Sequence, residues 1–276
     1  MSGFSADWLA LREPVDAAAR NPELTARLQD WRRRRGPLAV LDLASGTGAN
    51  VRFLAPLLGG EQRWRLVDHD PALLARGEES IGPWAAKRGL DLTLEWRVLD
   101  LARDEEWLDP PAVQLVTASA LLDLVSEEWL EQLARRCWQW RAAVFVVLSY
   151  DGSIVWEPGL DGDEQVREWV NRHQRTDKGF GPALGPEAAP ALASLLEHLG
   201  YRIELRPSPW RLGPEQAGIQ AALLAGWVEA ARRIEPVSAD EWADWSARRR
   251  RLIARGESRL GVGHWDMFAY IFADPC

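Results

Sequence analysis

Short apolar runs alternate with amphipathic, helix-length stretches between residues 38 and 149 of this chain. The runs predict strands at 38–44, 64–68, 92–100, 112–119 and 143–149. Apolar positions with the helical period lie between them, at about 48–58, 71–88 and 127–140. Strands that alternate with helices are typical of a parallel sheet with helices on both faces. We therefore predict a doubly wound α/β fold.

The first 36 residues predict two helices ahead of the first strand. Ser5 and Asn21, the latter followed by proline, are typical N-cap residues, and the Gly-Pro pair at 36–37 ends the second helix. Four side chains spaced by four share one approximate face of the first helix: Trp8, Arg12, Asp16 and Arg20. An Asp/Arg ladder at this spacing is usually a self-supporting surface.

The alternating pattern loosens after residue 149. A Gly-, Pro- and Asp-rich stretch at 151–163 predicts a loop, and a helix with a second loop follows up to residue 186. A helix at about 187–199 precedes a strand at 201–208, and only helical patterns occur at 214–260 before a last strand at 265–272. We predict one domain over 37–276 with insertions at about 151–186 and 214–260, the second one helical.

The charge of the chain argues against broad binding to nucleic acid. Its 276 residues carry a formal net charge of −8, whereas sequence-independent binding to phosphate backbones needs a basic surface. Two arginine quartets, at 32–35 and 248–251, are the exception. Four consecutive helical residues point in all directions, so each quartet is either a solvated helix end or a docking site for nucleic acid.

Nothing in the sequence indicates a membrane segment, a metal site or a disulfide framework. No apolar run approaches the roughly 20 residues that span a bilayer, and the N-terminal residues lack the layout of a secretory signal. The chain has 2 cysteines, too few for a disulfide framework or a metal-ligand cluster. We therefore expect a cytoplasmic protein without a metal cofactor.

A glycine-containing turn follows the first predicted strand, in the sequence LDLASGTGAN at 41–50. Gly46 and Gly48 suit a backbone that turns at positive φ and lies close to a ligand. The turn lacks the third glycine or alanine of the dinucleotide fingerprint and the lysine of a triphosphate-binding loop. Asp68 ends the second strand and Asp100 the third. Because ligands bind outside the carboxyl ends of such strands, these four residues are expected to converge.

This series of residues resembles the S-adenosylmethionine-binding core of class I, Rossmann-like methyltransferases. Their first-strand motif, acid-x-Gly-x-Gly-x-Gly, corresponds to D42-L-A44-S-G46-T-G48, with Ala44 in place of the first glycine. The resemblance covers roughly residues 38–150, and the strands at 201–208 and 265–272 match the family's final antiparallel pair. It implies a mostly parallel, seven-stranded sheet whose last strand is antiparallel.

The resemblance also implies a cofactor site and a lid. Asp68 would hold the ribose hydroxyls, and His69 would lie beside the adenine. Asp100 would face the adenine amino group, and Leu101 would offer a backbone N–H. The predicted cofactor-binding residues are Asp42, Ala44, Gly46, Gly48, Asn50, Asp68, His69, Asp100, Leu101 and Ser119. Residues 1–36 would fold over the cofactor as a lid, which is the alternative to a self-supporting helical surface.

Two segments are candidates for holding the methyl acceptor. In the resembling family the segment after the fourth strand faces the donor methyl group and the acceptor, which favours Ser119 and Asp123; the alternative for Asp123 is a helix-capping acid. The segment NRHQRTDK at 171–178 concentrates residue types that the chain nearly avoids and leads into a Gly/Pro-rich loop; its alternative is a polar surface helix. The predicted catalytic residues are His173 and Asp123, and the predicted substrate-binding residues are Ser119, Tyr150, Asn171, Asp177 and Lys178.

The sequence as a whole predicts an S-adenosylmethionine-dependent methyltransferase that acts on oxygen or nitrogen of a small polar metabolite. The acidic chain and a pocket built from insertions favour a small substrate over nucleic acid. The segment TASALL at 117–122 also lacks the Asn/Asp-Pro-Pro-aromatic motif of enzymes that methylate amino groups of bases. The alternatives are an RNA methyltransferase, a catalytically silent S-adenosylmethionine-binding protein, a nicotinamide-dependent dehydrogenase, and an α/β domain whose acids only cap loops.

Overall fold

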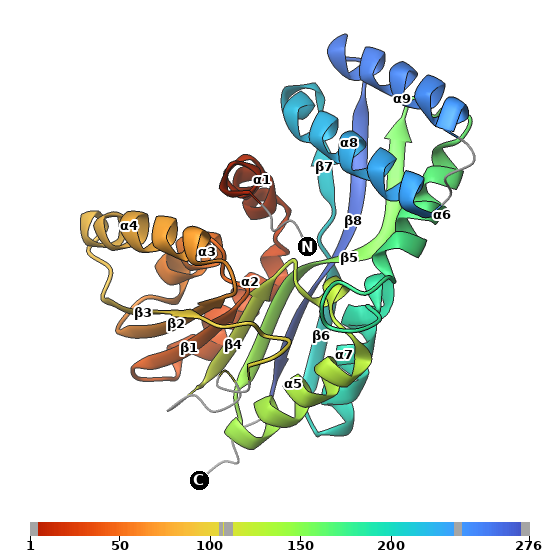
Figure 1. Ribbon diagram of the computed structural model, residues 1–276. Coiled ribbons are helices and arrows are strands. Elements are labelled where there is room, and N and C mark those ends of the chain that lie inside the picture. Colours follow the sequence, from red (N-terminus) through yellow and green to blue (C-terminus); the bar gives the residue numbers. More distant parts are fainter. Residues whose placement is uncertain (1–4, 105–106, 108–112, 235–238, 272–276) are drawn as a thin grey trace.

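A mixed sheet forms the centre of the computed structural model, which describes residues 5–104, 107, 113–234 and 239–271 (Figure 1). The sheet has the order β3-β2-β1-β4-β5-β8-β6, and β7 pairs with β8. Its strands are β1 Leu38–Leu43, β2 Gln62–Asp68, β3 Leu92–Val98, β4 Leu115–Ser119, β5 Ala143–Glu157, β6 Arg202–Pro207, β7 Trp210–Leu212 and β8 Arg259–Tyr270. The pairs among β1 to β5 are parallel, whereas β8 is antiparallel to its neighbours. This confirms the predicted fold class, and β7 is an additional short strand.

Helices cover both faces of the sheet, because alternate strand residues point to opposite sides. The helices are α1 Ala6–Ala19, α2 Pro22–Arg33, α3 Ala49–Leu58, α4 Pro71–Lys87, α5 Glu127–Trp140, α6 Asp163–Gln174, α7 Ala188–His198, α8 Ala217–Ile234 and α9 Ala239–Ala254. Val40 and Trp64 pack with α2, α3 and α4 on one face. Leu41 and Val67 pack with α5 and α7 on the other.

The longest strand corrects one expectation from the sequence. A loop was expected at 151–163, but β5 continues to Glu157 and rises beyond the edge of the parallel sheet (Figure 1). Buried Ile154 and Trp156 alternate with exposed Val155 and Glu157, as in a strand with one covered face. Gly152, with φ +93°, lies in a register shift between β5 and β8. This glycine and its acidic neighbour give the stretch the composition of a turn.

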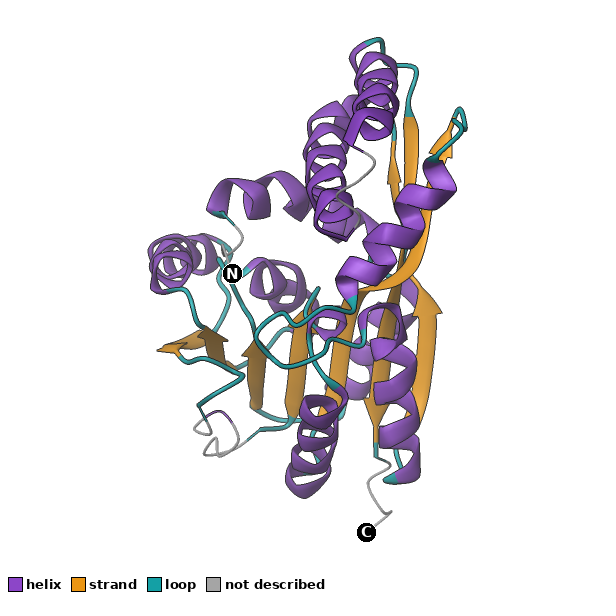
Figure 2. Ribbon diagram, turned by 45° about the vertical axis from the view of Figure 1, so that its right-hand side comes forward, coloured by secondary structure: helices purple, strands orange, loops and turns teal. Residues whose placement is uncertain are grey.

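The upper part of the molecule is called the cap here: residues 150–157 of β5, α6, β7, α8, α9 and residues 259–265 of β8. In the cap, α6 packs against α8, and α8 packs against α9, beside the extended strands (Figure 2). The helices α8 and α9 precede β8, as the predicted helical insertion requires. Residues 1–4 and 235–238, which belong to the predicted lid and insertion, lie outside the described residues.

A buried carboxylate joins the cap to the parallel sheet. Asp266 of β8 is 0% exposed. Its Oδ1 accepts hydrogen bonds from the Leu148 N–H at 2.9 Å and the Ser208 hydroxyl at 2.6 Å, and its Oδ2 accepts one from the Asn21 N–H at 2.8 Å. Leu148 has φ +56° and lies in the first register shift of β5. Asp266 thus ties together the kink in β5, the α1–α2 joint and the turn before β7.

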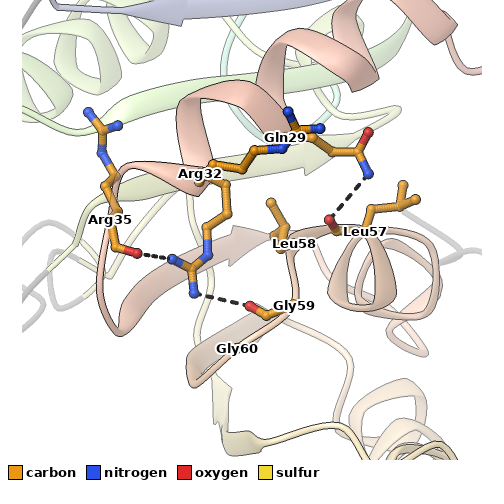
Figure 3. A pocket seen from close by; sticks show the side chains of 8 residues that line it. Gln29, Arg32, Arg35, Leu57, Leu58, Gly59 and Gly60 are labelled. Carbon is orange, nitrogen blue, oxygen red and sulfur yellow. Dashed lines mark hydrogen bonds between the residues drawn. The ribbon is translucent and has the colours of Figure 1, made fainter.

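Each arginine quartet contributes one side chain to the interior of the protein. Arg32 donates to the carbonyl oxygens of Arg35, Gly36 and Gly59 beside a hollow of about 270 Å³ at the amino ends of the strands (Figure 3). Arg249 is 0% exposed. It pairs with Asp163 and lies over the Trp156 ring at 4.7 Å. Neither guanidinium is free to bind phosphate.

Candidate functional site

The turn after β1 adopts the left-handed backbone conformation that its glycines favour. Gly46 has φ +54° and Gly48, the N-cap of α3, has φ +77°. A Cβ on Gly48 would lie 2.1 Å from the Ile81 Cδ1 atom, so any other residue would have to displace the end of that side chain as well as strain the backbone. Ala44 replaces the glycine of the family motif and still has φ +52°, at a cost of roughly 1–2 kcal/mol. The turn therefore keeps its shape in spite of the substitution.

Asp68 lies directly beneath this turn. The side chain is 5% exposed, and its Oδ2 accepts a hydrogen bond from the Gly46 N–H at 2.8 Å. Its Oδ1 accepts from the Asp70 N–H at 3.0 Å. The His69 ring is 62% exposed, with Nδ1 at 3.3 Å from Asp68 Oδ1. Because each carboxylate oxygen can accept two hydrogen bonds, Asp68 retains acceptor capacity at the ligand edge.

The turn after β3 contains a backbone N–H, that of Leu101, for which no described residue supplies an acceptor. Asp100 Oδ1 accepts from the Ala102 N–H at 2.9 Å. The Leu101 carbonyl oxygen accepts from two indoles, Trp107 Nε1 at 3.2 Å and Trp129 Nε1 at 2.8 Å. The Leu101 N–H has no partner within the described part of the chain. A hollow of about 420 Å³ opens between this turn, α5 and the loop at Phe180. The two tryptophans were not predicted, since nothing in their spacing indicates a shared acceptor.

Two buried charges lie at the carboxyl ends of β1 and α1. Asp42 is 1% exposed, and its Oδ1 accepts hydrogen bonds from Asn50 Nδ2 at 2.7 Å and Thr117 Oγ1 at 2.6 Å. Burial raises the pKa of Asp42 to about 6. Arg20 is 7% exposed, lies 4.9 Å from the centre of the Phe53 ring, and approaches Ser119 Oγ at 3.4 Å. Burial also lowers the pKa of Arg20. The sequence shows Arg20 only as part of a ladder, so its approach to Ser119 was not expected.

Helix α1 lies over the glycine turn, between the sheet edge and the cap (Figure 1). The Leu9 Cδ1 atom would be 3.0 Å from a Cβ on Gly46. Glu13 pairs with Arg52 of α3 at 2.6 Å. Asp16 pairs with Arg12 and accepts a hydrogen bond from the Trp210 indole of β7 at 3.1 Å. The helix therefore contacts both the glycine turn and the cap.

The candidate acceptor side begins where the cap meets the sheet. Asp123 follows β4 and is 7% exposed, with Oδ2 at 3.5 Å from Gln174 Nε2. Burial raises the pKa of Asp123 to about 6, although the charges of Arg12 and Lys178 lower it. Tyr150 donates its hydroxyl to Asn171 Oδ1 at 2.8 Å, and Asn171 Nδ2 donates to the Gly152 carbonyl. Asn171 therefore supports the exit of β5 into the cap.

The end of the 171–178 segment forms hydrogen bonds at the C-terminal end of α6. Lys178 is 9% exposed and donates to the His173 carbonyl at 2.7 Å and the Thr176 hydroxyl at 2.8 Å. Burial and the charge of Lys178 lower the pKa of His173. Asp177 is exposed and accepts hydrogen bonds from the Gly179 and Gly181 N–H groups. The structure brings His173 and Lys178 together, whereas Asp177 shapes a loop.

A further buried histidine lies beside the acceptor side, and the sequence did not single it out. His264 of β8 is 6% exposed and stands opposite Tyr150 in the β5–β8 pairing. Its ring centre is 5.2 Å from that of Trp210. Burial lowers the pKa of His264 to about 3, so the imidazole is neutral. Its Nδ1 atom has no hydrogen-bond partner among the described residues.

Comparisons with known proteins give the fold. No family model matches the chain, and no curated protein matches it. Phosphoethanolamine N-methyltransferase 2 of Haemonchus contortus, solved with S-adenosyl-L-methionine, is 15% identical with a TM-score of 0.50 over 98% of this chain and 58% of that one. The YcgJ protein of Bacillus subtilis is 12% identical with a TM-score of 0.50 over 92% of this chain and 100% of that one. The chain has the Rossmann-like methyltransferase fold. It spans little more than half of the Haemonchus chain.

The Rossmann-like methyltransferase fold explains why the sequence-predicted cofactor residues converge. Asp42 lies near the end of β1, Ala44, Gly46 and Gly48 lie on the turn after it, and Asn50 lies in the first turn of α3. The ends of β2, β3 and β4, at 68–69, 100–101 and 119, meet the same edge of the sheet.

Neither a metal site nor a membrane span is found in the part of the chain that the structure describes. No group of three or more His, Cys, Asp or Glu side chains there could hold a metal ion. None of the described helices is both long enough and apolar enough to cross a bilayer.

Proposed function

We propose that this protein transfers a methyl group from S-adenosylmethionine to a nitrogen or oxygen atom of a small polar molecule. The observation that carries the proposal is the Asp68 carboxylate beneath the Gly46 turn, at the carboxyl edge of a Rossmann-like methyltransferase sheet. A structure of the same fold, the Haemonchus contortus enzyme, holds S-adenosyl-L-methionine. The formal net charge of −8 favours a small acceptor over RNA.

The residues of the site would bind the cofactor along the strand ends. Asp68 would accept hydrogen bonds from the ribose hydroxyls. The Leu101 N–H, which has no acceptor among the described residues, would donate to the adenine ring. His69, exposed beside Asp68, would cover the adenine. When bound, S-adenosylmethionine supplies an activated methyl group on its sulfonium. The protein then has to place the acceptor in line and exclude water, and α1 would do both as a lid.

Asp123 is the residue that we propose as general base. It lies in the short helical turn Leu122–Leu124, four residues after Ser119. Burial raises its pKa to about 6, which suits a base that works near neutral pH. Tyr150 and Ser119 would line the acceptor pocket with it. His173 is less suited, because it lies with Lys178 at the end of α6 and the adjacent cation disfavours its protonation. Asn171 would support the pocket through its hydrogen bonds with Tyr150 and Gly152. Lys178 and Asp177 would support it through their hydrogen bonds at the end of α6 and in the loop after it.

Binding of S-adenosylhomocysteine tests the cofactor assignment directly. We expect the wild-type protein to bind it in calorimetry and to bind NAD much more weakly. Asp68→Ala should weaken S-adenosylhomocysteine binding about tenfold to hundredfold, since it removes a charged acceptor of ribose hydrogen bonds. Asp30→Ala on the exposed surface of α2 is the control and should leave binding unchanged. Equal affinity of a folded Asp68→Ala variant would remove the ribose assignment.

A further inference from the structure

Arg12 is held in place on the side of α1 that faces the cap. Its Nε and Nη2 atoms donate to the two carboxylate oxygens of Asp16 at 2.8 and 3.2 Å. Its guanidinium lies 5.0 Å from the centre of the Trp210 ring and 5.9 Å from that of Trp8. The Trp210 indole in turn donates to Asp16 at 3.1 Å. These contacts fix the planar guanidinium before any ligand binds.

One end of this guanidinium is unused. The pair with Asp16 takes the edge formed by Nε and Nη2, which is two of the five N–H groups. The Nη1 atom donates to none of the described residues, and its surface is not fully enclosed by protein. The end formed by Nη1 and Nη2 can therefore donate two parallel hydrogen bonds to a planar or tetrahedral anion.

His264 adds a second unused polar atom beside the same tryptophan. Its side chain is 6% exposed, its ring centre is 5.2 Å from that of Trp210, and its Nδ1 atom has no partner among the described residues. Burial, and then the charge of Arg12, lower the pKa of His264 to about 3. Arg12 is the one charged side chain of the described residues that shifts this pKa. The potential at the imidazole is therefore positive, although the ring itself is neutral.

Both groups belong to the acceptor side of the molecule and not to the cofactor turn. The charge of Arg12 also lowers the pKa of Asp123, the proposed base. His264 stands opposite Tyr150 in the β5–β8 pairing, and the backbone of Tyr150 lowers the same pKa of Asp123. A different side of α1 contacts the glycine turn and α3, through Leu9 and Glu13.

We propose that Arg12 and His264 bind an anionic oxygen group, a carboxylate or a phosphate, of the methyl acceptor. The inference rests on the proposed function and names the class of its substrate. The free end of Arg12 would donate two hydrogen bonds to the anion, and the neutral imidazole would donate a third from Nδ1. The nucleophile of the acceptor would then point to Asp123. A neutral or cationic molecule offers no such partner to the guanidinium.

Four small probes that differ in charge test the site by saturation-transfer NMR on the full chain: acetate, methylphosphonate, acetamide and methylammonium. At least one of the two anions should bind the wild-type protein, and acetamide and methylammonium should not. Arg12→Gln should weaken binding of the anion about tenfold to hundredfold, because it removes a charged hydrogen-bond partner. His264→Phe, which keeps a ring, should weaken it about twofold to tenfold. Arg135→Gln, in an i,i+4 pair with Glu131 and 67% exposed, is the matched control and should change nothing.

The outcomes separate this inference from the proposed function. Binding of acetate alone assigns a carboxylate, binding of methylphosphonate alone assigns a phosphate, and binding of both supports the site for either. The inference is overturned if wild type binds neither anion, if acetamide binds as tightly as acetate, or if Arg12→Gln binds the anion like wild type.

The affinity of Arg12→Gln for S-adenosylhomocysteine should stay within about twofold, since other residues of α1 contact the glycine turn. Equal weakening of nucleoside and anion would make Arg12 a structural residue and would also overturn the inference. A wild-type protein that binds no S-adenosylhomocysteine refutes the proposed function, whereas the anion titrations need no nucleoside and still test the site. Arg12→Lys, which keeps the charge and loses the planar fork, should also weaken anion binding and serves if the glutamine variant does not fold.

Discussion

Replacement of Asp123 by asparagine should lower the turnover number about 10²- to 10⁴-fold, the usual contribution of a general base. The asparagine keeps the shape of the side chain and its contact with Gln174 but accepts no proton. Affinity for S-adenosylhomocysteine should stay within about twofold, because the side chain acts on the acceptor and not on the donor. Asp161→Asn, an exposed change in the loop before α6, is the matched control and should leave turnover unaltered.

The role of Asp123 in catalysis and its effect on stability can be separated by measuring turnover and the free energy of unfolding against pH, for wild type and for Asp123→Asn. Burial raises the pKa of Asp123 to about 6, so wild-type turnover should rise with pH up to about pH 6 and then level off. The raised pKa also means that the folded protein holds this proton more tightly than the unfolded chain. Its contribution to the free energy of unfolding is therefore present at acid pH and is lost as pH rises from about 4 to 6. Asp123→Asn should remove both effects, and so be no less stable than wild type at pH 7. A variant that keeps the wild-type rate and pH profile would exclude Asp123 as the base.

The sheet could be predicted because each of its parallel strands is recognisable from its own stretch of sequence. Fully buried parallel strands read as apolar runs, and helices between them keep a helical period. The extension of β5 was missed for a local reason. Gly152 and Asp151 resemble a turn, whereas the alternation of Tyr150, Ile154 and Trp156 with polar or exposed neighbours becomes meaningful only once α6 and α8 cover one face.

The cofactor turn was predictable and the buried charges around it were not. A glycine turn and the acids at strand ends are local in sequence, so one stretch of chain indicates them. Arg20 and Ser119 are separated by 99 positions, and Trp210 and Asp16 by 194. Helical spacing places Arg20 on a face of α1, but only the tertiary structure shows that this face is buried against the sheet edge.

Removal of the Asp266 carboxylate should cost more stability than any exposed substitution in the chain. Asp266→Ala leaves the Leu148 and Asn21 N–H groups and the Ser208 hydroxyl without their acceptor, in a place where the side chain is 0% exposed. It also removes one of the negative charges that act on the buried Arg20. Loss of one partner from such a buried network typically costs about 3–5 kcal/mol. Urea denaturation at pH 7 should show this loss in the free energy of unfolding.

Two further variants show whether the loss of stability comes from the hydrogen bonds that Asp266 accepts. Asp266→Asn retains one carbonyl oxygen and should lose about 1–3 kcal/mol, since an amide NH₂ then faces a donor. Asp244→Ala, on the exposed side of α9, should change the free energy of unfolding by less than about 0.5 kcal/mol. The three acceptor bonds join β5, the α1–α2 joint and the turn before β7, so their loss should loosen the cap and α1 together. A loss below about 1 kcal/mol for Asp266→Ala would show that the kink in β5 holds the cap in place without this carboxylate.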